Sequence, residues 1–153
     1  MIPLSLLVGF LLQVSALAPA PPPSSSVIVG LQDGEKLTLA DPQFTGFIQT
    51  RDNDSVLLYK QKDFHGELKV NNIQRIDVHY RKGRPYDLSV ALKNGQKLDV
   101  QSDKRDFLTV KGATDSGFVT IKNPDPLSPK IRLSSHPQNR KHDQTIQYLE
   151  FPR

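Results

Sequence analysis

Two stretches of the chain, residues 27–39 and 88–100, repeat almost the same pattern of apolar and polar residues. They read VIVGLQDGEKLTL and LSVALKNGQKLDV, and Gly34 aligns with Gly95 at an offset of 61 residues. In the second stretch, apolar residues alternate with polar or small ones on both sides of a short polar turn, which is typical of a β-hairpin, and the first stretch has the same turn. A chain that contains this hairpin twice is constrained to build antiparallel sheet, and we predict an all-β fold.

The length of the turn follows from where the apolar residues must lie. A two-residue turn at Asn94-Gly95 would place Val90 opposite Asp99 and would split the apolar side chains between both faces. A three-residue loop instead places Val90 opposite Leu98, so that one face of the hairpin is apolar. Gly95 would then adopt the left-handed conformation of a G1 bulge. The same register pairs Leu88 with Val100, Val29 with Leu37 and Val27 with Leu39, and places Gly34 at the equivalent bulge.

Further similarities follow the two hairpins in the same order. Asp54-Ser55 aligns with Asp115-Ser116 at the same offset, and residues 73–78, IQRIDV, resemble residues 146–151, IQYLEF, at an offset of 73. The second copy therefore contains about twelve additional residues, most of them in SSHPQNRKHDQT. We interpret the pattern as a tandem duplication of about 60 residues. The alternative is independent recurrence of a common strand–turn–strand pattern.

Short apolar segments bounded by turn residues complete each copy, and no helical periodicity is seen after residue 18. Five strands in about 60 residues favour a small antiparallel barrel. The expected strands are 44–50, 56–59, 67–70 and 73–78 in the first copy and 107–110, 118–121, 131–133 and 146–151 in the second.

The recurring pattern resembles that of the SH3-like and Sm-like small barrels. It reads V-x-L-x-(D/N)-G-x-x-L, then an Asp-Ser turn, then a closing I-x-x-(I/L)-x-(V/F), and it covers both halves of residues 27–151. The resemblance implies two tandem SH3-like small antiparallel barrels, and the two repeats could either pack together or share one sheet. It departs from the Sm pattern, which has a Gly soon after the first turn, and no RNA-contact motif accompanies it. The resemblance therefore implies a fold and not an RNA-binding function.

The N-terminus differs from the rest of the chain, since MIPLSLLVGFLLQVSALA carries no charged side chain. The apolar run from Leu4 to Leu12 has the length of a signal-peptide core and is short for a membrane span. We predict a signal peptide over residues 1–16, with a cut after residue 18 as the alternative. Cleavage would make the protein periplasmic or secreted, whereas an uncleaved segment would leave it anchored in the membrane.

The segment after the signal peptide has the composition of a tether. Residues 17–26 include PAPPPSSS, in which Pro favours an extended chain and Ser adds flexibility. We predict a Pro/Ser-rich linker over residues 17–26, a first β repeat over 27–85 and a second over 86–153.

Composition restricts the chemistry that this chain can perform. The chain contains no Cys, which excludes disulfides, thiolate metal sites and Cys nucleophiles. Its 20 basic and 16 acidic residues give a net charge of +4, which permits weak attraction to anionic surfaces. We expect no cofactor.

Three groups of residues resemble parts of known catalytic or metal sites. Asp115-Ser116-Gly117 matches the D-(S/T)-G of aspartic proteases, but that chemistry needs two such Asp residues, and the repeat partner Asp54-Ser55-Val56 lacks the Gly. His136 and His142 share one polar loop, whereas a metal needs at least three converging ligands. Asp52 and Asp54 could suggest a Ca²⁺ site, but neither EF-hand spacing nor a distal Glu follows, and the segment has the composition of a turn. We therefore predict no catalytic residue and no metal site.

The best binding candidates lie at the junction between the repeats. The basic residues Arg81, Lys82 and Arg84 could contact an anionic partner, and the aromatic residues Tyr80 and Tyr86 flank them. The alternative is that the basic residues lie in solvated loops and that the Tyr residues lie in the core or on a strand face.

These observations favour an exported, non-catalytic binding or scaffold module. Its partner would be a protein segment or an anionic polymer of the cell envelope, bound by loops and by the seam between the repeats. We expect no nucleic-acid partner and no transmembrane segment after signal cleavage. The alternatives are a hydrolase that uses scattered carboxylates, or a cytosolic nucleic-acid-binding small barrel if the N-terminus is not a signal.

Overall fold

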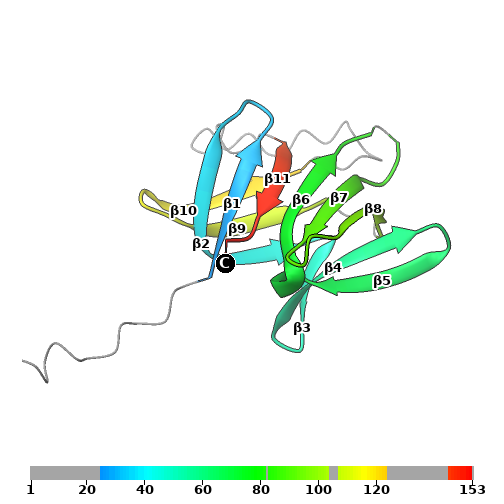
Figure 1. Cartoon of the computed structure of the whole chain (residues 1–153). Coiled ribbons are helices and arrows are strands. Elements are labelled where there is room, and N and C mark those ends of the chain that lie inside the picture. Colours follow the sequence, from blue (N-terminus) through cyan, green and yellow to red (C-terminus); the bar gives the residue numbers. More distant parts are fainter. Residues whose placement is uncertain (1–24, 82, 104–106, 124–144, 153) are drawn as a thin grey trace, which may run out of the picture.

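The computed structural model describes residues 25–81, 83–103, 107–123 and 145–152. Within these ranges the fold is nearly all β, as predicted, and the one helical element is a short 3₁₀ helix, Val70–Asn72 (Figure 1). No helix in these ranges has the length and apolarity needed to span a membrane. The predicted signal peptide, most of the linker and the predicted strand 131–133 lie outside the described residues.

Eleven strands are present in the described ranges. The first six are β1 (Ser26–Leu31), β2 (Lys36–Thr45), β3 (Ile48–Arg51), β4 (Asp54–Gln61), β5 (Phe64–Lys69) and β6 (Ile73–His79). The others are β7 (Asp87–Leu92), β8 (Lys97–Ser102), β9 (Thr109–Thr114), β10 (Gly117–Lys122) and β11 (Ile146–Glu150).

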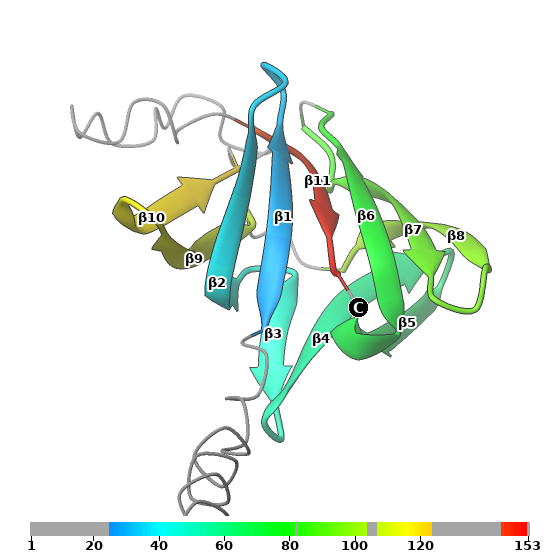
Figure 2. The ribbon, with the colours of Figure 1, turned by 60° about the vertical axis from the view of Figure 1, so that its left-hand side comes forward.

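All eleven strands belong to one antiparallel sheet. Their order is β10–β9–β2–β1–β11–β6–β7–β8–β4–β3, and β5 also pairs with β4. The sheet curls into a half-barrel, which is seen from two sides in Figures 1 and 2. Strand β11 lies between β1 and β6, and β9 pairs with β2, so pairing crosses the boundary predicted at residues 85 and 86. The two halves therefore share one curled sheet, which is one of the two arrangements that the sequence left open.

Both repeated stretches form the predicted hairpins with three-residue loops. Gly34 and Gly95 have φ angles of +89° and +91°, the left-handed region that glycine occupies at little cost. The observed pairs are Val90–Leu98 and Leu88–Val100 in β7–β8, and Val29–Leu37 and Val27–Leu39 in β1–β2. The register predicted from the apolar face is confirmed in both copies.

The strand expected over residues 44–50 is interrupted in its middle. Strand β2 ends at Thr45 and β3 begins at Ile48. Between them Gly46 has a φ of +101°, and a Cβ atom there would lie 2.3 Å from the backbone oxygen of Phe107. The chain turns here because only glycine fits both the backbone angle and this close approach.

One apolar core fills the inside of the curled sheet. Its fully buried side chains come from both halves of the chain, so neither half encloses a core of its own. Each fully buried aliphatic side chain stabilises the fold by about 1.5–3 kcal/mol through removal of apolar surface from water. The largest fully buried side chains, aromatic and aliphatic together, are those of Tyr86, Phe47, Leu31, Leu39, Ile48, Leu57, Ile73, Ile76, Leu88, Leu108, Ile121 and Ile146.

Candidate functional site

The residues predicted at the junction lie in and beside the connection from β6 to β7, but they do not form one surface. Tyr80 is 38% exposed, whereas Tyr86 is fully buried. Tyr86 is therefore not a surface residue, contrary to the prediction. The reason is strand periodicity: Tyr86 precedes Leu88 and Val90 at spacings of two, and all three point into the core. Lys82 lies outside the described residues.

Tyr86 joins the junction to the core. Its ring packs against Phe47 at 6.0 Å between centroids and against Tyr80 at 5.8 Å. Its backbone N–H donates to the hydroxyl of Ser102 at 3.1 Å, and its carbonyl accepts from the Ser102 N–H at 2.9 Å. Because Ser102 is also buried, these contacts fix the start of β7 against the end of β8.

The two described basic residues of the junction are exposed. Arg81 forms an ion pair with Asp87, with 2.6 Å between Nε and Oδ2. Arg84 donates its backbone N–H to the carbonyl of Arg81 at 3.2 Å, which closes the turn. The ion pair directs the Arg81 side chain across the start of β7, toward the groove described next.

A groove of about 520 Å³ lies where β4, β7 and β8 meet. Its walls include Lys60 and Lys62 from the first half of the chain, Arg81 from the junction, and Asp87 and Gln101 from the second half. We call this surface the seam groove. It is lined by residues of both halves of the chain, and of the predicted candidate residues it contains Arg81.

The acidic groups of the seam groove are already partnered. Asp87 pairs with Arg81 and also accepts a hydrogen bond from the Gln101 amide at 3.1 Å. Asp99 accepts from the Ser89 hydroxyl at 3.0 Å. These contacts hold the carboxylates in place along the β7–β8 wall.

The two lysines of the seam groove differ from the carboxylates, because neither forms an ion pair within the described part of the chain. Lys60 is half-buried at the end of β4, and Lys62 is exposed in the following turn with a φ of +53°. Sequence analysis missed both residues. The sequence did contain a signal for them, since the segment KQK directly follows the apolar part of a predicted strand. Its two lysines are two residues apart, a spacing that places both cations on one side of the chain before the turn.

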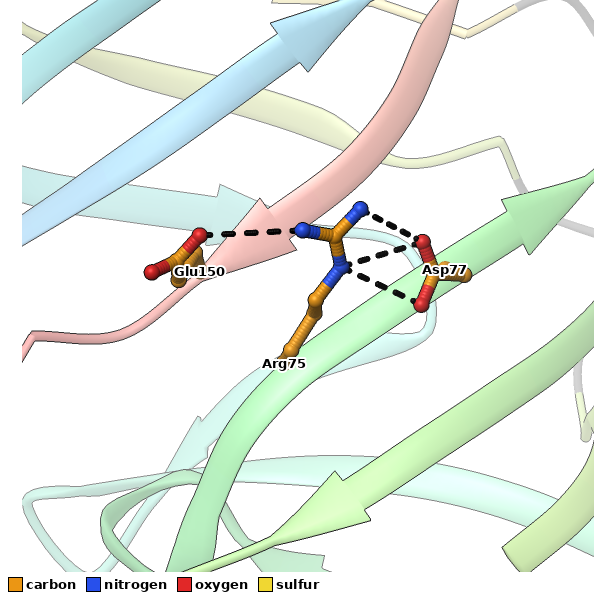
Figure 3. A network of polar contacts seen from close by, with 3 residues as sticks. All are labelled: Arg75, Asp77 and Glu150. Carbon is orange, nitrogen blue, oxygen red and sulfur yellow. Dashed lines mark hydrogen bonds and ion pairs between the residues drawn. The ribbon is translucent and has the colours of Figure 1, made fainter. Parts of the chain in front are cut away.

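A second polar network lies on the outer side of the central strands (Figure 3). The Arg75 guanidinium donates to the Asp77 carboxylate at 2.9–3.2 Å, and its other terminal nitrogen lies 3.7 Å from Glu150 on β11. Arg75 also lies over the Tyr148 ring, 3.9 Å from its centroid. The hydrogen bonds to Asp77 raise the pKa of Arg75. The network connects β6 to β11, and we assign it to stability.

The other candidate groups do not assemble into a reactive site. Asp115 and Ser116 form the turn between β9 and β10, and the Ser116 N–H donates to Thr114 Oγ1 at 3.2 Å. Asp54 pairs with Lys69 at 3.3 Å. Among the residues that the structure places, no three His, Asp or Glu side chains gather as metal ligands. His136 and His142 lie outside the described residues.

Comparison of the chain with family models, with curated proteins and with solved structures found no match.

Proposed function

We propose that the protein is an exported, non-catalytic binding module whose seam groove takes an acidic segment of an envelope protein or an anionic polymer. The observation that carries the proposal is the pair Lys60 and Lys62. Both cations border a groove of about 520 Å³ without an ion-pair partner in the described ranges, and Arg81 also lines this groove. An anionic ligand would supply the missing partners.

The electrostatics favour weak, salt-dependent binding. An exposed lysine–carboxylate pair contributes about 0.2–1 kcal/mol, and salt at 0.15 M screens charges over about 8 Å. Two such pairs, with added contacts to the groove walls, suit a ligand that presents several negative charges in a row. A binding role rather than a hydrolytic one is supported by Asp87 and Asp99, whose carboxylates are partnered by neighbouring side chains.

The N-terminal segment supplies the second part of the proposal. A signal peptide over residues 1–16 would export the chain, and the linker over residues 17–26 would hold the folded part at a distance from its attachment. Export limits the partners to those of the cell envelope or the outside. The two small β repeats, with their SH3-like pattern, would act as the platform for the groove.

The test is a titration of fluorescent polyglutamate with the purified mature chain. We expect binding that weakens as salt rises, and a loss of at least tenfold in affinity for Lys60→Glu/Lys62→Glu. The matched control is Lys36→Glu/Lys97→Glu, which changes the net charge equally at two exposed hairpin positions outside the groove. Equal losses in the two variants would reject the groove, and preferential binding of a single-stranded oligonucleotide would favour the nucleic-acid alternative.

A further inference from the structure

Each hairpin pairs with one closing strand: β11 pairs with the β1–β2 hairpin, and β6 pairs with the β7–β8 hairpin. The two pairings have the same register, but each closing strand comes from the other half of the chain. In β1–β11, Val29 lies opposite Leu149, and in β7–β6, Val90 lies opposite Ile76. Val29 and Val90 are separated by the hairpin offset of 61, and Ile76 and Leu149 by the closing-strand offset of 73. Each pair is thus the counterpart of the other.

The irregularities of these two strand pairs match as well. The register of β1–β11 shifts between Gly30 and Leu31. That of β6–β7 shifts between Ile73 and Arg75, which pair with Leu92 and Ala91, the counterparts of Leu31 and Gly30. Beyond the shift, the Gln32 N–H donates to the Thr145 carbonyl at 3.1 Å, and the equivalent Lys93 N–H donates to Asn72 at 2.9 Å. A bulge and a hydrogen bond at equivalent places are difficult to explain by independent recurrence of a hairpin pattern.

The outer strands follow the same rule. Strand β9 joins β2 with Ala113 opposite Ala40, and β4 joins β8 with Lys60 opposite Gln101. Ala40 and Gln101 differ by the hairpin offset, and Lys60 and Ala113 by 53. The turn Asp115-Ser116 is therefore equivalent to Lys62-Asp63, and the alignment with Asp54-Ser55 made from the sequence is wrong.

A two-fold axis relates the halves where equivalent residues meet. Ile76 lies opposite its own counterpart Leu149 in the β6–β11 pair. Gly46 lies against its hairpin-offset counterpart Phe107, with an ideal Cβ only 2.3 Å from the Phe107 oxygen. Contacts between a residue and its own counterpart define an isologous interface, in which both halves contribute the same surface patch. Here the chain crosses itself near the axis, and each hairpin is completed by strands of the other half.

We propose that the chain is an internal dimer, in which two equivalent repeats exchange strands about a two-fold axis through Ile76 and Leu149. The axis gives the protein two equivalent surfaces, and only one of them, the seam groove, binds an anionic ligand. The first part rests on the strand registers alone. The second part rests on the proposed function.

The ligand assignment follows from comparing the two equivalent surfaces. Across β7, β8, β4 and β5, one row of paired residues reads Asp87, Gln101, Lys60 and His65. The equivalent row across β1, β2, β9 and β10 reads Ser26, Ala40, Ala113 and Phe118. Because the second row forms the same strand pairs without charge, the fold does not require the charges of the first. Lys62 likewise has Asp115 as its counterpart. The difference favours one acidic ligand per chain.

The exchange is tested by cutting the connection between the halves. A site-specific protease sequence inserted after Gly83, in the exposed turn of the junction, would be cleaved in the folded full chain. We expect both fragments to elute together as one species near 17 kDa and to unfold in one urea transition. Separation into two folded fragments, or two transitions, would overturn the exchange. If the insertion prevents folding, amide hydrogen exchange of the uncut protein tests the same point. We expect the amides of the β1–β11 and β6–β7 pairs to open together, and independent opening would contradict the exchange of strands.

The ligand assignment is tested by copying the lysines onto the equivalent surface. Ala113→Lys/Asp115→Lys reproduces Lys60 and Lys62 at their counterparts, and we expect it to raise polyglutamate stoichiometry from one to two per chain. A stoichiometry that stays at one, with wild-type binding intact, would overturn the equivalence of the two surfaces for ligand binding. Absence of wild-type binding would reject the proposed function and this assignment, while the cleavage result would still decide the exchange.

Discussion

Ile76 and Leu149 lie directly opposite each other in the pair of β6 with β11, and both side chains are fully buried. They are separated by 73 residues of sequence, yet they occupy the centre of the sheet, where its two halves join. They belong to a single core to which both halves of the chain contribute.

Replacement of either residue by Ala removes packing at this centre. We expect Ile76→Ala and Leu149→Ala each to lower the free energy of unfolding by about 2–5 kcal/mol, as found for large-to-small changes in cores. Urea denaturation followed by circular dichroism measures both values. The control is Ile28→Ala at a half-buried position of β1, where the loss should be smaller. A tolerated change at either central position would contradict the joined core.

Substitutions at Gly30 and at its counterpart Ala91 should both destabilise the fold, but to different degrees. A Cβ atom at Gly30 would lie 2.0 Å from Cε1 of Tyr148, so Gly30→Ala must displace a ring that is almost fully buried. We expect a loss of about 1–3 kcal/mol in unfolding free energy, as for overpacked sites. Ala91→Gly, at a position that already holds a side chain, should cost only about 0.5–1 kcal/mol. Thermal and urea unfolding measure both. An equal or stabilising effect of Gly30→Ala would show that Tyr148 is not held there.

The bulge glycines should be sensitive to conformation alone. Gly95 has a φ of +91°, and an added Cβ would meet no atom within 4 Å. Gly95→Ala should therefore cost about 1–2 kcal/mol, the strain of a left-handed backbone. Gly95→Asn should cost less, because Asn tolerates this conformation. Equal stability of the Ala and Asn variants in urea titrations would contradict a strained bulge.

Arg75 should stabilise the β6–β11 pair modestly. Arg75→Met removes the Asp77 hydrogen bonds and the contact with Tyr148, and we expect a loss of about 1 kcal/mol that shrinks as salt rises. Because the pKa of Arg75 is raised, its contribution does not decline as the pH rises from 7 and is lost only above the ordinary pKa of Arg. A stability difference between wild type and variant that disappears between pH 7 and 10 would contradict this assignment.

The export prediction concerns the N-terminal segment and is independent of the groove. The full chain with a C-terminal tag should be recovered outside the cytosol with an intact mass that lacks residues 1–16 or 1–18. A full-length cytosolic product would reject the envelope partner and make nucleic-acid binding the next test. A full-length membrane-bound product would indicate an anchored module on a Pro/Ser stalk.

Much of the local structure could be predicted from the sequence, because strand and turn signals act over a few residues. The three-residue loops followed from the apolar faces of Val90 and Leu98 and from the position of Gly95. Pairing over long distances carries no such signal. The exchange of strands between halves depends on how β11 and β9 dock, and a repeat pattern alone is equally compatible with two separate barrels.

The candidate site was predicted only in part for a similar reason. The junction could be identified from its basic residues, and Arg81 does border the seam groove. Tyr86 was misplaced although its spacing from Leu88 and Val90 already indicated an inward side chain. Lys60 and Lys62 come close to Arg81 only because β4 pairs with β8, which is a long-range contact.

The most direct test of the account is one NMR titration of the ¹⁵N-labelled mature protein with polyglutamate. The two equivalent surfaces then serve as site and internal control in the same spectrum. We predict that amide signals of residues 60–62, 87–89 and 99–101 shift, whereas those of residues 26–28, 38–40 and 113–115 do not. Shifts of similar size on both surfaces, or none at the seam groove, would contradict the assignment of the groove as the single anionic-ligand site.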